Sequence, residues 1–295
     1  MTDESEWLTG QFEGERARLR GVAYRMLGSV SEADDAMQEA WLRISRADTD
    51  GVENMAGWLT TVVARVCLNL LRSREARREV ALDTHVPDPI IGPEHDSDPE
   101  QQALLADSVG LALMVVLETL TPAERLAFVL HDMFAVPFDE IGTMLDRSPA
   151  AARQLASRGR RRVQGGAPEP DPDVTRQREV VDAYFAAARD GDFAALVAVL
   201  HPDVVLRADS GPLRPQRTVV LRGAETVAAQ ARMAQALVRF VRPALVNGTA
   251  GAVAVSSDRV IAVMGFTVTD GLITAIDVLN DPDRLAALDV SMLDD

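Results

Sequence analysis

The stretch from Pro137 to Arg162 constrains the fold most, because it has the pattern of two short helices joined by a tight turn. In the first helix, three apolar residues recur at helical spacing and predict a face that packs on a core: Phe138, Ile141 and Leu145. Asp146 and Arg147 interrupt this pattern. Ser148 is then a suitable N-cap, and Pro149 stands where a first helical residue tolerates proline. The stretch predicts a helix-turn-helix.

The second helix of this pair is loaded with arginine. Its narrow apolar stripe consists of Ala152, Leu155 and Ala156. Polar and basic residues cover the rest: Arg153, Gln154, Arg158, Arg160, Arg161 and Arg162. From Asp146 to Arg162 there are six arginines and one acid, a local charge of +5 in a chain of net charge −15. This is typical of a helix that enters a DNA groove, although a solvated basic tail would have the same composition.

Composition bounds the remaining possibilities. A chain of 295 residues predicts two or three domains, and its hydrophobic content of 47% can fill their cores. No apolar run is long enough to span a membrane, and the polar, acidic stretch 1–10 predicts no signal peptide. A single cysteine, Cys67, excludes an intrachain disulfide and suits a reducing cytosol. One cysteine and four scattered histidines give no zinc-ligand pattern, so we expect a cytoplasmic protein without a metal or cofactor.

The negative net charge argues against a protein that coats nucleic acid unaided. The acids are also unevenly placed, because the range 79–107 contains eight of them and no arginine. We therefore expect a DNA reader that is weak alone and depends on a larger partner for affinity.

The first part of the chain, about 6–78, predicts only helices. Ser31 is a plausible N-cap for a helix over 32–45, and a longer helix follows over 55–74. The buried face of that longer helix is expected to comprise Trp58, Leu59, Val62, Val63, Val66, Cys67, Leu70 and Leu71. On its opposite side lie Thr61, Arg65, Asn69 and Arg72.

Two linkers and a capped helix follow. The acidic range 79–100 contains four prolines and little periodicity, which predicts a linker, and helices resume near Gln101. Thr121 to Glu124 form a capping box that opens a helix to about Asp132. A second linker, QGGAPEPDPD, covers 164–173.

Beyond residue 173 the pattern changes to mixed helix and strand. Helices are predicted up to Asp190, over 193–200 and over 224–237. Strands are predicted at 204–208, 219–222, 240–246, 252–256, 260–268 and 272–279. Asn247-Gly248 and Asp270-Gly271 are strong hairpin signals. This part therefore predicts an α+β domain with an antiparallel, curved sheet.

The motifs in this order carry a resemblance. SEADDAMQEAWLRI (31–44), GWLTTVVARVCLNLLRSR (57–74) and the helix-turn-helix resemble bacterial RNA polymerase sigma factors of the extracytoplasmic-function type, which keep two conserved domains, region 2 and region 4. This resemblance covers about 6–163. The stretch DAYFAAARDGDFAALVAVLHPDVVLRAD (182–209) resembles the SnoaL-like α+β cone fold, which a subgroup of these sigma factors carries as a C-terminal extension.

The resemblance implies two all-α sigma domains followed by a SnoaL-like cone-shaped domain. The expected boundaries are region 2 at 6–78, an acidic linker at 79–105, region 4 at 106–163, a second linker at 164–173 and the SnoaL-like domain at 174–290. Eight carboxylates without a nearby cation suit a basic polymerase channel, through which the family threads its linker. A plain solubilising spacer explains the same composition.

Region 2 carries two implied surfaces. In the family its acidic helix docks on core RNA polymerase, which here implies Asp34, Asp35, Gln38, Glu39 and Leu42. A solvated acidic face would look the same. Its long helix reads and melts the −10 promoter element, which implies Thr61, Arg65, Asn69, Arg72 and Arg74. Family members often have Asp where this chain has Asn69.

Region 4 implies a reader of the −35 element in the major groove. Residues near the start of its second helix reach base edges, which assigns Ala151, Arg153 and Gln154 to bases. The DNA backbone is assigned to Ser148, Arg158, Arg160 and Arg161.

The sequence says less about the function of the C-terminal domain than about regions 2 and 4. SnoaL-like folds include cyclases and isomerases with an acid/base group in a cone-shaped pocket, and the candidates here are Asp209, Asp277, Arg207 and His201. Sequence spacing places no titratable pair among them, so we expect no catalysis, while a small-molecule ligand stays open. A tail motif comprises Asn280, Asp283, Arg284 and Leu285, and it resembles the subgroup's Asn-Pro-Asp-Lys-Leu motif with an inserted Asp281 and arginine for lysine. In the family this tail bears on sigma activity; a turn with a short capping helix explains it equally well.

The main hypothesis is a sigma factor that binds core RNA polymerase and promoter DNA and is modulated in cis by its C-terminal domain. The alternatives are a DNA-binding module fused to a SnoaL-like cyclase or isomerase, and a conventional helix-turn-helix regulator. The sequence identifies no separate anti-sigma partner.

Overall fold

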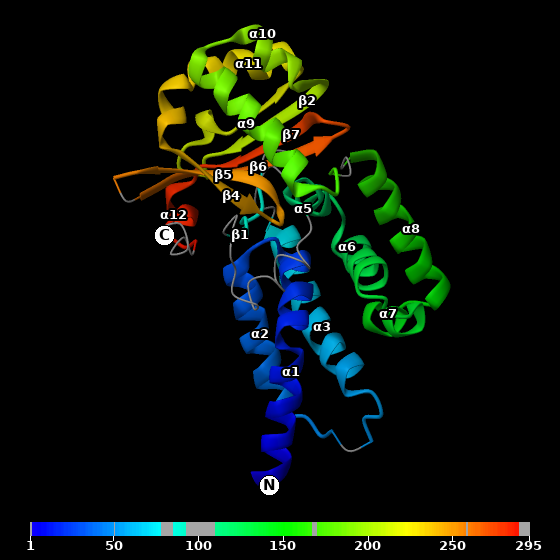
Figure 1. The fold of residues 1–295 in the computed structure, drawn as a ribbon. Helices are drawn as coiled ribbons and strands as arrows, with labels where there is room; N and C mark the ends of the chain where they lie inside the picture. The colour runs from blue at the N-terminus through cyan, green and yellow to red at the C-terminus, as the bar shows by residue number, and fades with distance from the viewer. Residues whose placement is uncertain are drawn as a thin grey trace. The chain divides into compact units, whose positions relative to one another are not determined.

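The structure, a computed structural model, describes residues 2–49, 51–77, 85–92, 110–166, 170–257 and 259–288. The chain divides into two compact units (Figure 1). Unit 1 comprises Met1–Val80 and Val116–Gly166, and unit 2 comprises Ala81–Val115 and Ala167–Asp295. Among the described helices, none is both long and apolar enough to cross a membrane.

Unit 1 begins with three helices that pack on one another, α1 (Thr2–Leu27), α2 (Val30–Ile44) and α3 (Met55–Arg77). The predicted N-cap of α2 was wrong: Ser29, not Ser31, accepts the bond from the Glu32 amide at 3.4 Å, so the helix begins at Val30. On α3, Leu68 is buried and Leu70 is 38% exposed, against the prediction for Leu70. The helical fold of this part is otherwise as predicted.

The second part of unit 1 contains the predicted capping box and helix-turn-helix. Its elements are the end of α5 (Leu111–Glu118), α6 (Pro122–Phe128), a π-helical turn (Val129–Met133), α7 (Phe138–Leu145) and α8 (Pro149–Gly166). At the start of α6 the Thr121 hydroxyl accepts from the Glu124 amide, and the Glu124 carboxylate accepts from the Thr121 amide, both at 3.3 Å. The helix expected to reach Asp132 changes to π-helical geometry at Val129.

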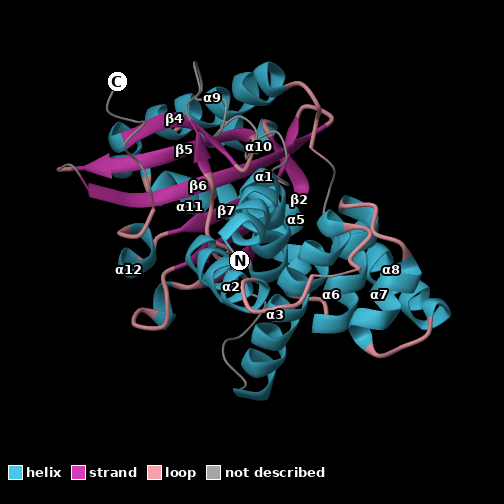
Figure 2. Cartoon of the chain, turned by 90° about the horizontal axis from the view of Figure 1, so that it is seen from below, coloured by secondary structure: helices cyan, strands magenta, loops and turns pink. Residues whose placement is uncertain are grey.

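Unit 2 is an α+β domain, as predicted (Figure 2). Its helices are α9 (Val174–Asp190), α10 (Phe193–Ala198), α11 (Ala224–Met233) and α12 (Pro282–Leu285). Its strands are β1 (Ile91–Gly92), β2 (Leu200–Asp209), β3 (Val219–Arg222), β4 (Val241–Val246), β5 (Thr249–Ser256), β6 (Arg259–Thr269) and β7 (Leu272–Leu279). The strand order is β1-β4-β5-β6-β7-β2-β3. All neighbours are antiparallel except β2 and β7, which run parallel.

The hairpins form where the sequence predicts them. Asn247 and Gly248 have φ of 51° and 75°, and Asp270 and Gly271 have φ of 53° and 74°. Positive φ at both central residues defines the type I′ turn that matches the twist of paired strands. The Asp171 carboxylate, from the second linker, accepts from the amides of Asp270 and Gly271 at 3.0 and 3.1 Å.

The core of unit 2 lies between the sheet and α9, α10 and α11 (Figure 1). Three aromatic rings form its centre, and the ring centroids of Tyr184, Phe185 and Phe266 lie 5.4 to 5.5 Å apart in edge-to-face arrangements. Such aromatic pairs add to the stabilisation from buried area.

We predict that Phe266→Ala lowers the free energy of unfolding of unit 2 by about 3–5 kcal/mol, since it removes a ring that is 2% exposed. Leu213→Ala is the control, because Leu213 is 80% exposed. Chemical denaturation of both variants, followed by circular dichroism, measures the difference. Equal losses in the two variants would contradict the prediction.

Candidate nucleic-acid interface

Local backbone contacts fix the turn between α7 and α8. Asp146 ends α7 in the left-handed conformation at φ 54°, which aspartate tolerates better than most residues. Gly142 lies so close to the carbonyl oxygen of Arg147 that an added Cβ would stand 2.8 Å from it. The Ser148 hydroxyl accepts from the Ala151 amide at 3.2 Å and so caps α8. The predicted helix-turn-helix and its N-cap are confirmed.

α8 turns one side to the core and the other to solvent. Its buried residues are Ala152, Leu155, Ala156 and Gly159. A Cβ added at Gly159 would lie 2.9 Å from the Phe128 Cβ, so glycine lets α8 approach α6 this closely. Ala151 is half-buried, and the exposed residues are Ser148, Arg153, Gln154, Arg158, Arg160 and Arg161. The structure therefore brings the predicted −35 set together on one face.

Several arginines of α8 already have partners within unit 1. Arg160 donates through Nε to the Asp132 carboxylate at 2.8 Å. Arg162 pairs with Glu124 at 3.1 Å and also donates to the Thr119 carbonyl. The Arg153 guanidinium lies 5.2 Å from the centroid of the Phe138 ring. A DNA phosphate that binds Arg160 has to replace Asp132. The positive electrostatic potential of this face is therefore weaker than the number of its arginines implies.

The predicted −10 face of α3 is partly engaged as well. Arg65, Asn69 and Arg72 are exposed, while Thr61 is half-buried and donates to the Gly57 carbonyl at 3.0 Å. Arg74 donates to the Leu27 carbonyl at 3.0 Å and pairs with Glu32. Arg74 therefore holds α3 to the junction of α1 and α2, a structural role that sequence reasoning missed.

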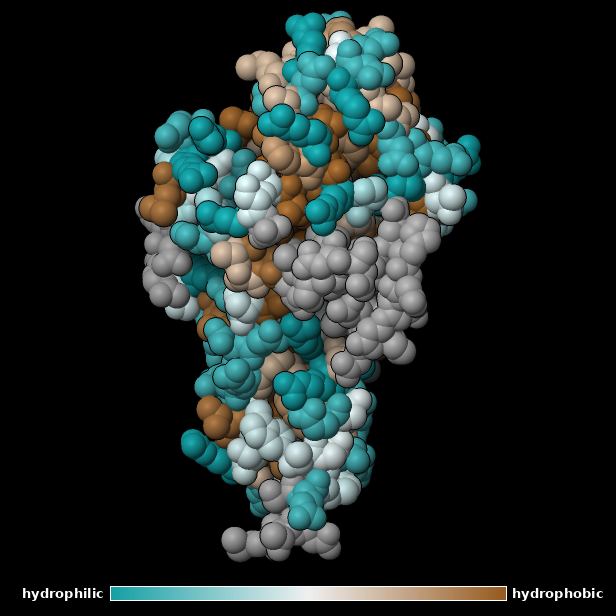
Figure 3. Space-filling view, turned by 60° about the vertical axis from the view of Figure 1, so that its left-hand side comes forward, coloured by the Kyte–Doolittle hydropathy of each residue, from teal (hydrophilic) through white to brown (hydrophobic). Residues whose placement is uncertain are grey.

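The acidic helix α2 presents an exposed stripe at positions i, i+3, i+4 and i+7. It consists of Asp35, Gln38, Glu39 and Leu42, and Leu42 is 50% exposed. Figure 3 shows the helical lower part of the molecule as a largely hydrophilic surface with isolated hydrophobic residues. Asp34 stands apart, because Arg20 binds its carboxylate with two bonds of 2.6 and 3.1 Å. This hydrogen bonding to Asp34 raises the pKa of Arg20.

The tail motif binds the linker through Arg284. Its Nε donates to Asp88 at 2.7 Å, its Nη1 to Asp209 at 2.9 Å, and its Nη2 to the Val86 carbonyl at 2.6 Å. Asp209 also accepts from the Val86 amide at 3.1 Å and lies 3.2 Å from His85. We call these five residues the linker clamp. Its linker side was missed by sequence reasoning, although Asp88 between Pro87 and Pro89 marks a rigid extended segment.

Asp209 is ionised in the linker clamp. Burial alone would raise the pKa of its carboxyl, but hydrogen bonds from His85 and from the amides of Val86 and Gly211, with the charge of Arg284, lower that pKa to about 2. The other tail residues fix the position of Arg284. The Asn280 side chain accepts from Ser210 at 2.8 Å, Leu285 is buried, and Asp281 caps α12 by accepting from the Asp283 amide at 3.0 Å.

The linker also adds a strand to the sheet of unit 2. Ile91 and Gly92 pair antiparallel with the end of β4. Ile90 extends this pairing, since its amide donates to the Asn247 side chain at 2.9 Å and its carbonyl accepts from the Asn247 amide at 2.8 Å. Of the eight acids expected in the linker range, only Asp88 belongs to the described residues. Residues 101–109 of the helix expected from Gln101 also lie outside the described residues.

Of the four catalytic candidates, the structure brings together only Asp277 and Arg207. Asp209 belongs to the linker clamp, and Asp277 pairs with Arg207 at 3.1 Å with its side chain 1% exposed. Burial raises the pKa of Asp277, against the effect of Arg207. His201 lines a separate cavity of about 540 Å³ with Asp203 and Asp270. Within the described ranges, no group of three or more acids, histidines or cysteines could hold a metal ion.

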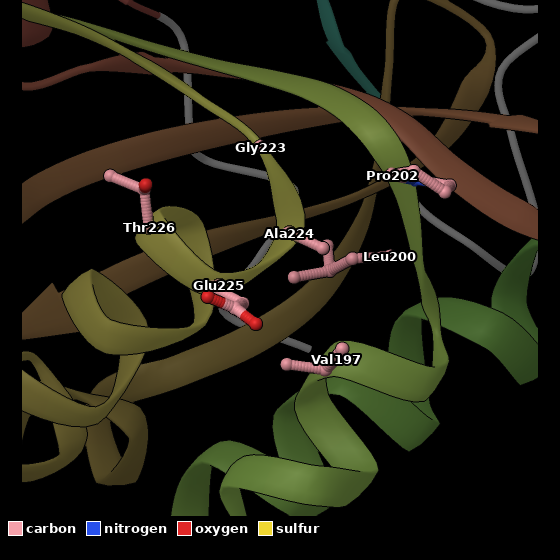
Figure 4. Close-up of a pocket in the computed structure, with 7 residues that line it drawn as sticks. All are labelled: Val197, Leu200, Pro202, Gly223, Ala224, Glu225 and Thr226. Atoms are coloured by element: carbon pink, nitrogen blue, oxygen red, sulfur yellow. The ribbon is translucent and has the colours of Figure 1, made fainter.

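A further cavity of about 450 Å³ opens beside the start of α11 (Figure 4). Its lining comes from α10, β2 and α11 and consists of Val197, Leu200, Pro202, Gly223, Ala224, Glu225 and Thr226. Glu225 is the single titratable side chain among these lining residues, so the cavity offers no acid/base pair.

Comparison with known proteins matches both helical parts. The family of Sigma-70 region 2 matches residues 12–77, and Sigma-70, region 4 matches residues 110–163. The chain is 41% identical to the ECF RNA polymerase sigma factor SigJ of Mycobacterium tuberculosis, over 93% of this chain and 92% of that protein. It is 32% identical to a probable ECF sigma factor, SigI, of the same species, over 95% and 96% of the two chains.

The crystal structure of Mycobacterium tuberculosis SigJ has the same fold, with a TM-score of 0.74 at 36% identity, over 95% of this chain and 99% of that one. This chain combines two sigma regions, a helix-turn-helix with a basic outer face and a strand-rich C-terminal domain. The chain belongs to the extracytoplasmic-function RNA polymerase sigma factors, in the subgroup with a SnoaL-like C-terminal domain.

Proposed function

We propose that this chain binds core RNA polymerase in the cytoplasm, directs it to promoters, and has its activity modulated in cis by the C-terminal domain. The sigma function follows from the family. The modulation rests on one observation: the linker between regions 2 and 4 is bound by Arg284 and by β4 of the C-terminal domain. A linker held in this way is unavailable for the polymerase channel.

In this proposal, region 2 covers 6–78 and reads and melts the −10 element through Thr61, Arg65, Asn69, Arg72 and Arg74. The stripe of Asp35, Gln38, Glu39 and Leu42, with Asp34 at its edge, docks on the polymerase. Its support is the spacing that puts three polar side chains around one exposed leucine. A half-exposed leucine contributes apolar area to a docked interface, and the acids set its orientation.

Region 4, at 106–163, reads the −35 element with α8. Arg153 and Gln154 stand in the first turns of α8, where side chains of a recognition helix reach base edges. Arg158, Arg160 and Arg161 lie further along the same exposed side and bind phosphates. The Ser148 hydroxyl caps α8. Its role in binding the DNA backbone is therefore mainly to fix where the helix begins.

We propose no catalytic activity for the SnoaL-like domain. Asp209, one of the acid/base candidates, is ionised in the linker clamp because its pKa is lowered to about 2, and Asp277 is paired with Arg207. The polar residues of the tail motif thus serve in binding the linker rather than a substrate.

The sigma function is tested by in vitro transcription with core polymerase, using the full chain and a version that ends at Gly166. We expect promoter-specific transcripts from both, with different output, because the short version lacks Arg284 and β4. Absence of transcripts from both at every candidate promoter would overturn the sigma assignment. Equal output from both would remove the modulating role of the C-terminal domain alone.

Base recognition by α8 gives a sharper expectation. Arg153→Ala should weaken −35 binding of the holoenzyme by about 1–3 kcal/mol and relax the preference at one base position. The matched control is Arg189→Ala, which removes an equal charge from an exposed position of α9. Binding to promoter libraries measures both effects. An unchanged preference at every −35 position would rule out this contact.

The linker clamp gives an expectation for Arg284. Arg284→Ala should destabilise the bound linker by about 2–3 kcal/mol, because it leaves two carboxylates without their charged donor. Hydrogen exchange at residues 85–92 should then become faster, while Arg239→Ala, an exposed control, leaves it unchanged.

The linker clamp should also depend on pH. Since the pKa of Asp209 is lowered to about 2, the contribution of its carboxylate to the stability of the bound linker is fully present above pH 4 and is lost as pH falls from about 4 to 2. A loss of hydrogen-exchange protection at residues 85–92 between pH 7 and pH 6 in the unmodified chain, after correction for the intrinsic exchange rate, would contradict this account.

A further inference from the structure

The segment just before the helix-turn-helix departs from regular α-helical geometry. From Val129 to Met133 the chain forms a π-helical turn, and Ala135 then takes a left-handed φ of 54°. A π-helical turn is rare, and the left-handed conformation costs free energy in a residue with a Cβ, so surrounding contacts have to stabilise both. What distinguishes this turn is the position that it gives to two consecutive side chains, His131 and Asp132.

The imidazole of His131 packs on the ring of Phe138. The two rings are stacked, with centroids 3.8 Å apart and planes inclined by 29°. His131 Nδ1 lies 3.1 Å from the Val136 carbonyl oxygen, and because a carbonyl oxygen only accepts, Nδ1 is the donor. This hydrogen bond restrains the imidazole. Phe138, the first residue of α7, is half-buried, whereas its spacing in the sequence predicts a place in the core.

The ring of Phe138 also contacts Arg153 of α8. The guanidinium carbon lies 5.2 Å from the ring centroid, within the distance of about 6 Å at which cation–π attraction acts. Arg153 is exposed, and in the described part of the chain no acceptor binds its N–H groups. Arg160 is held differently, since Asp132 accepts from its Nε and Nη2 and so occupies donors. The phenyl ring therefore restrains Arg153 and leaves its donors available.

This combination suits an arginine that reads a base. Recognition of guanine uses two N–H donors on O6 and N7, which the planar guanidinium supplies only in one orientation. A free arginine side chain loses rotamer entropy when binding fixes it in that orientation. A side chain that an aromatic ring already restrains loses less entropy on binding guanine, and it adapts less well to a base with another pattern of acceptors.

We propose that Phe138, supported by His131, is a positioning residue that holds Arg153 in the orientation that reads a guanine of the −35 element. This rests on the proposed function, in which Arg153 contacts a −35 base. The π-helical turn then serves the DNA-reading face twice, because His131 supports the ring beside Arg153 and Asp132 binds Arg160. Phe138 acts only through Arg153.

The first test measures binding of the holoenzyme to promoter libraries that are randomised in the −35 element. Phe138→Leu keeps an apolar side chain but removes the ring, and it should lower the discrimination at the base that Arg153 reads by about two- to tenfold. Phe138→Tyr keeps the ring and should keep the discrimination. Added to Arg153→Ala, Phe138→Leu should cause no further loss, because it acts only through that arginine.

The matched control is Phe134→Leu, the same substitution at a half-buried phenylalanine four residues earlier. The Phe134 ring contacts Arg18 and Arg25 of α1, whose guanidinium carbons lie 5.9 and 4.9 Å from the ring centroid. Its loss should leave the base discrimination unchanged. His131→Asn is a second variant, which keeps a donor close to the position of Nδ1 but removes the stacked ring. It should lower the discrimination in the same direction as Phe138→Leu.

The second test needs neither polymerase nor DNA. In a proton–nitrogen correlation spectrum of the full chain, the Nε–H signal of Arg153 is identified by its loss in Arg153→Ala. The ring current of Phe138 displaces this signal. We therefore expect the signal to move in Phe138→Leu and to stay close to its original position in Phe138→Tyr and in Phe134→Leu.

An unmoved Arg153 signal in Phe138→Leu would overturn the proposal. So would unchanged discrimination in Phe138→Leu where Arg153→Ala relaxes it, or an equal loss at every −35 position, which a merely structural role predicts. If Phe138→Leu does not fold, the same outcomes are read from His131→Asn. Unchanged preference in Arg153→Ala would instead refute the base contact in the proposed function, while the signal in the free chain would still decide whether Phe138 holds Arg153.

Discussion

Within unit 2, one side chain, Arg284, joins the linker residues Val86 and Asp88 to Asp209 of the C-terminal domain. The planar guanidinium binds two carboxylates and a backbone carbonyl at once, which a lysine ammonium could not do with the same geometry. The neighbouring residues 90–92 then extend the sheet at β4. The C-terminal domain thus acts as a binding module for a segment of its own chain.

Two arginine contacts join segments that are far apart in the chain. The linker clamp lies in unit 2 and limits the course of the chain between regions 2 and 4. In unit 1, Arg125 of α6 donates to the Arg25 carbonyl of α1. Each uses a buried or half-buried arginine, so each has a desolvation cost that limits its net strength.

The family resemblance and the local patterns gave most of the fold. The capping box at Thr121, the cap at Ser148 and the two hairpin turns depend on residues within three or four positions, so sequence determines them. The α2 N-cap was misplaced by two residues because Ser29 and Ser31 are equally good caps in isolation. In the structure α2 begins at Val30, and Ala33, Ala36 and Ala40 are buried. Leu70 is 38% exposed although its spacing fits the predicted buried face.

The sequence by itself determined the order of regions, the basic face of α8, the acidic stripe of α2 and the tail motif around Arg284. The basic face and the acidic stripe are properties of composition and helical period, whereas the order of regions and the tail motif were identified through the family resemblance. Only the tertiary structure decided that Asp209 serves the linker clamp, that Arg74 and Arg160 already have partners, and that Arg125 reaches the Arg25 carbonyl. These contacts join residues up to about two hundred positions apart, and local pattern carries no information on which distant carboxylate or carbonyl a given arginine will meet.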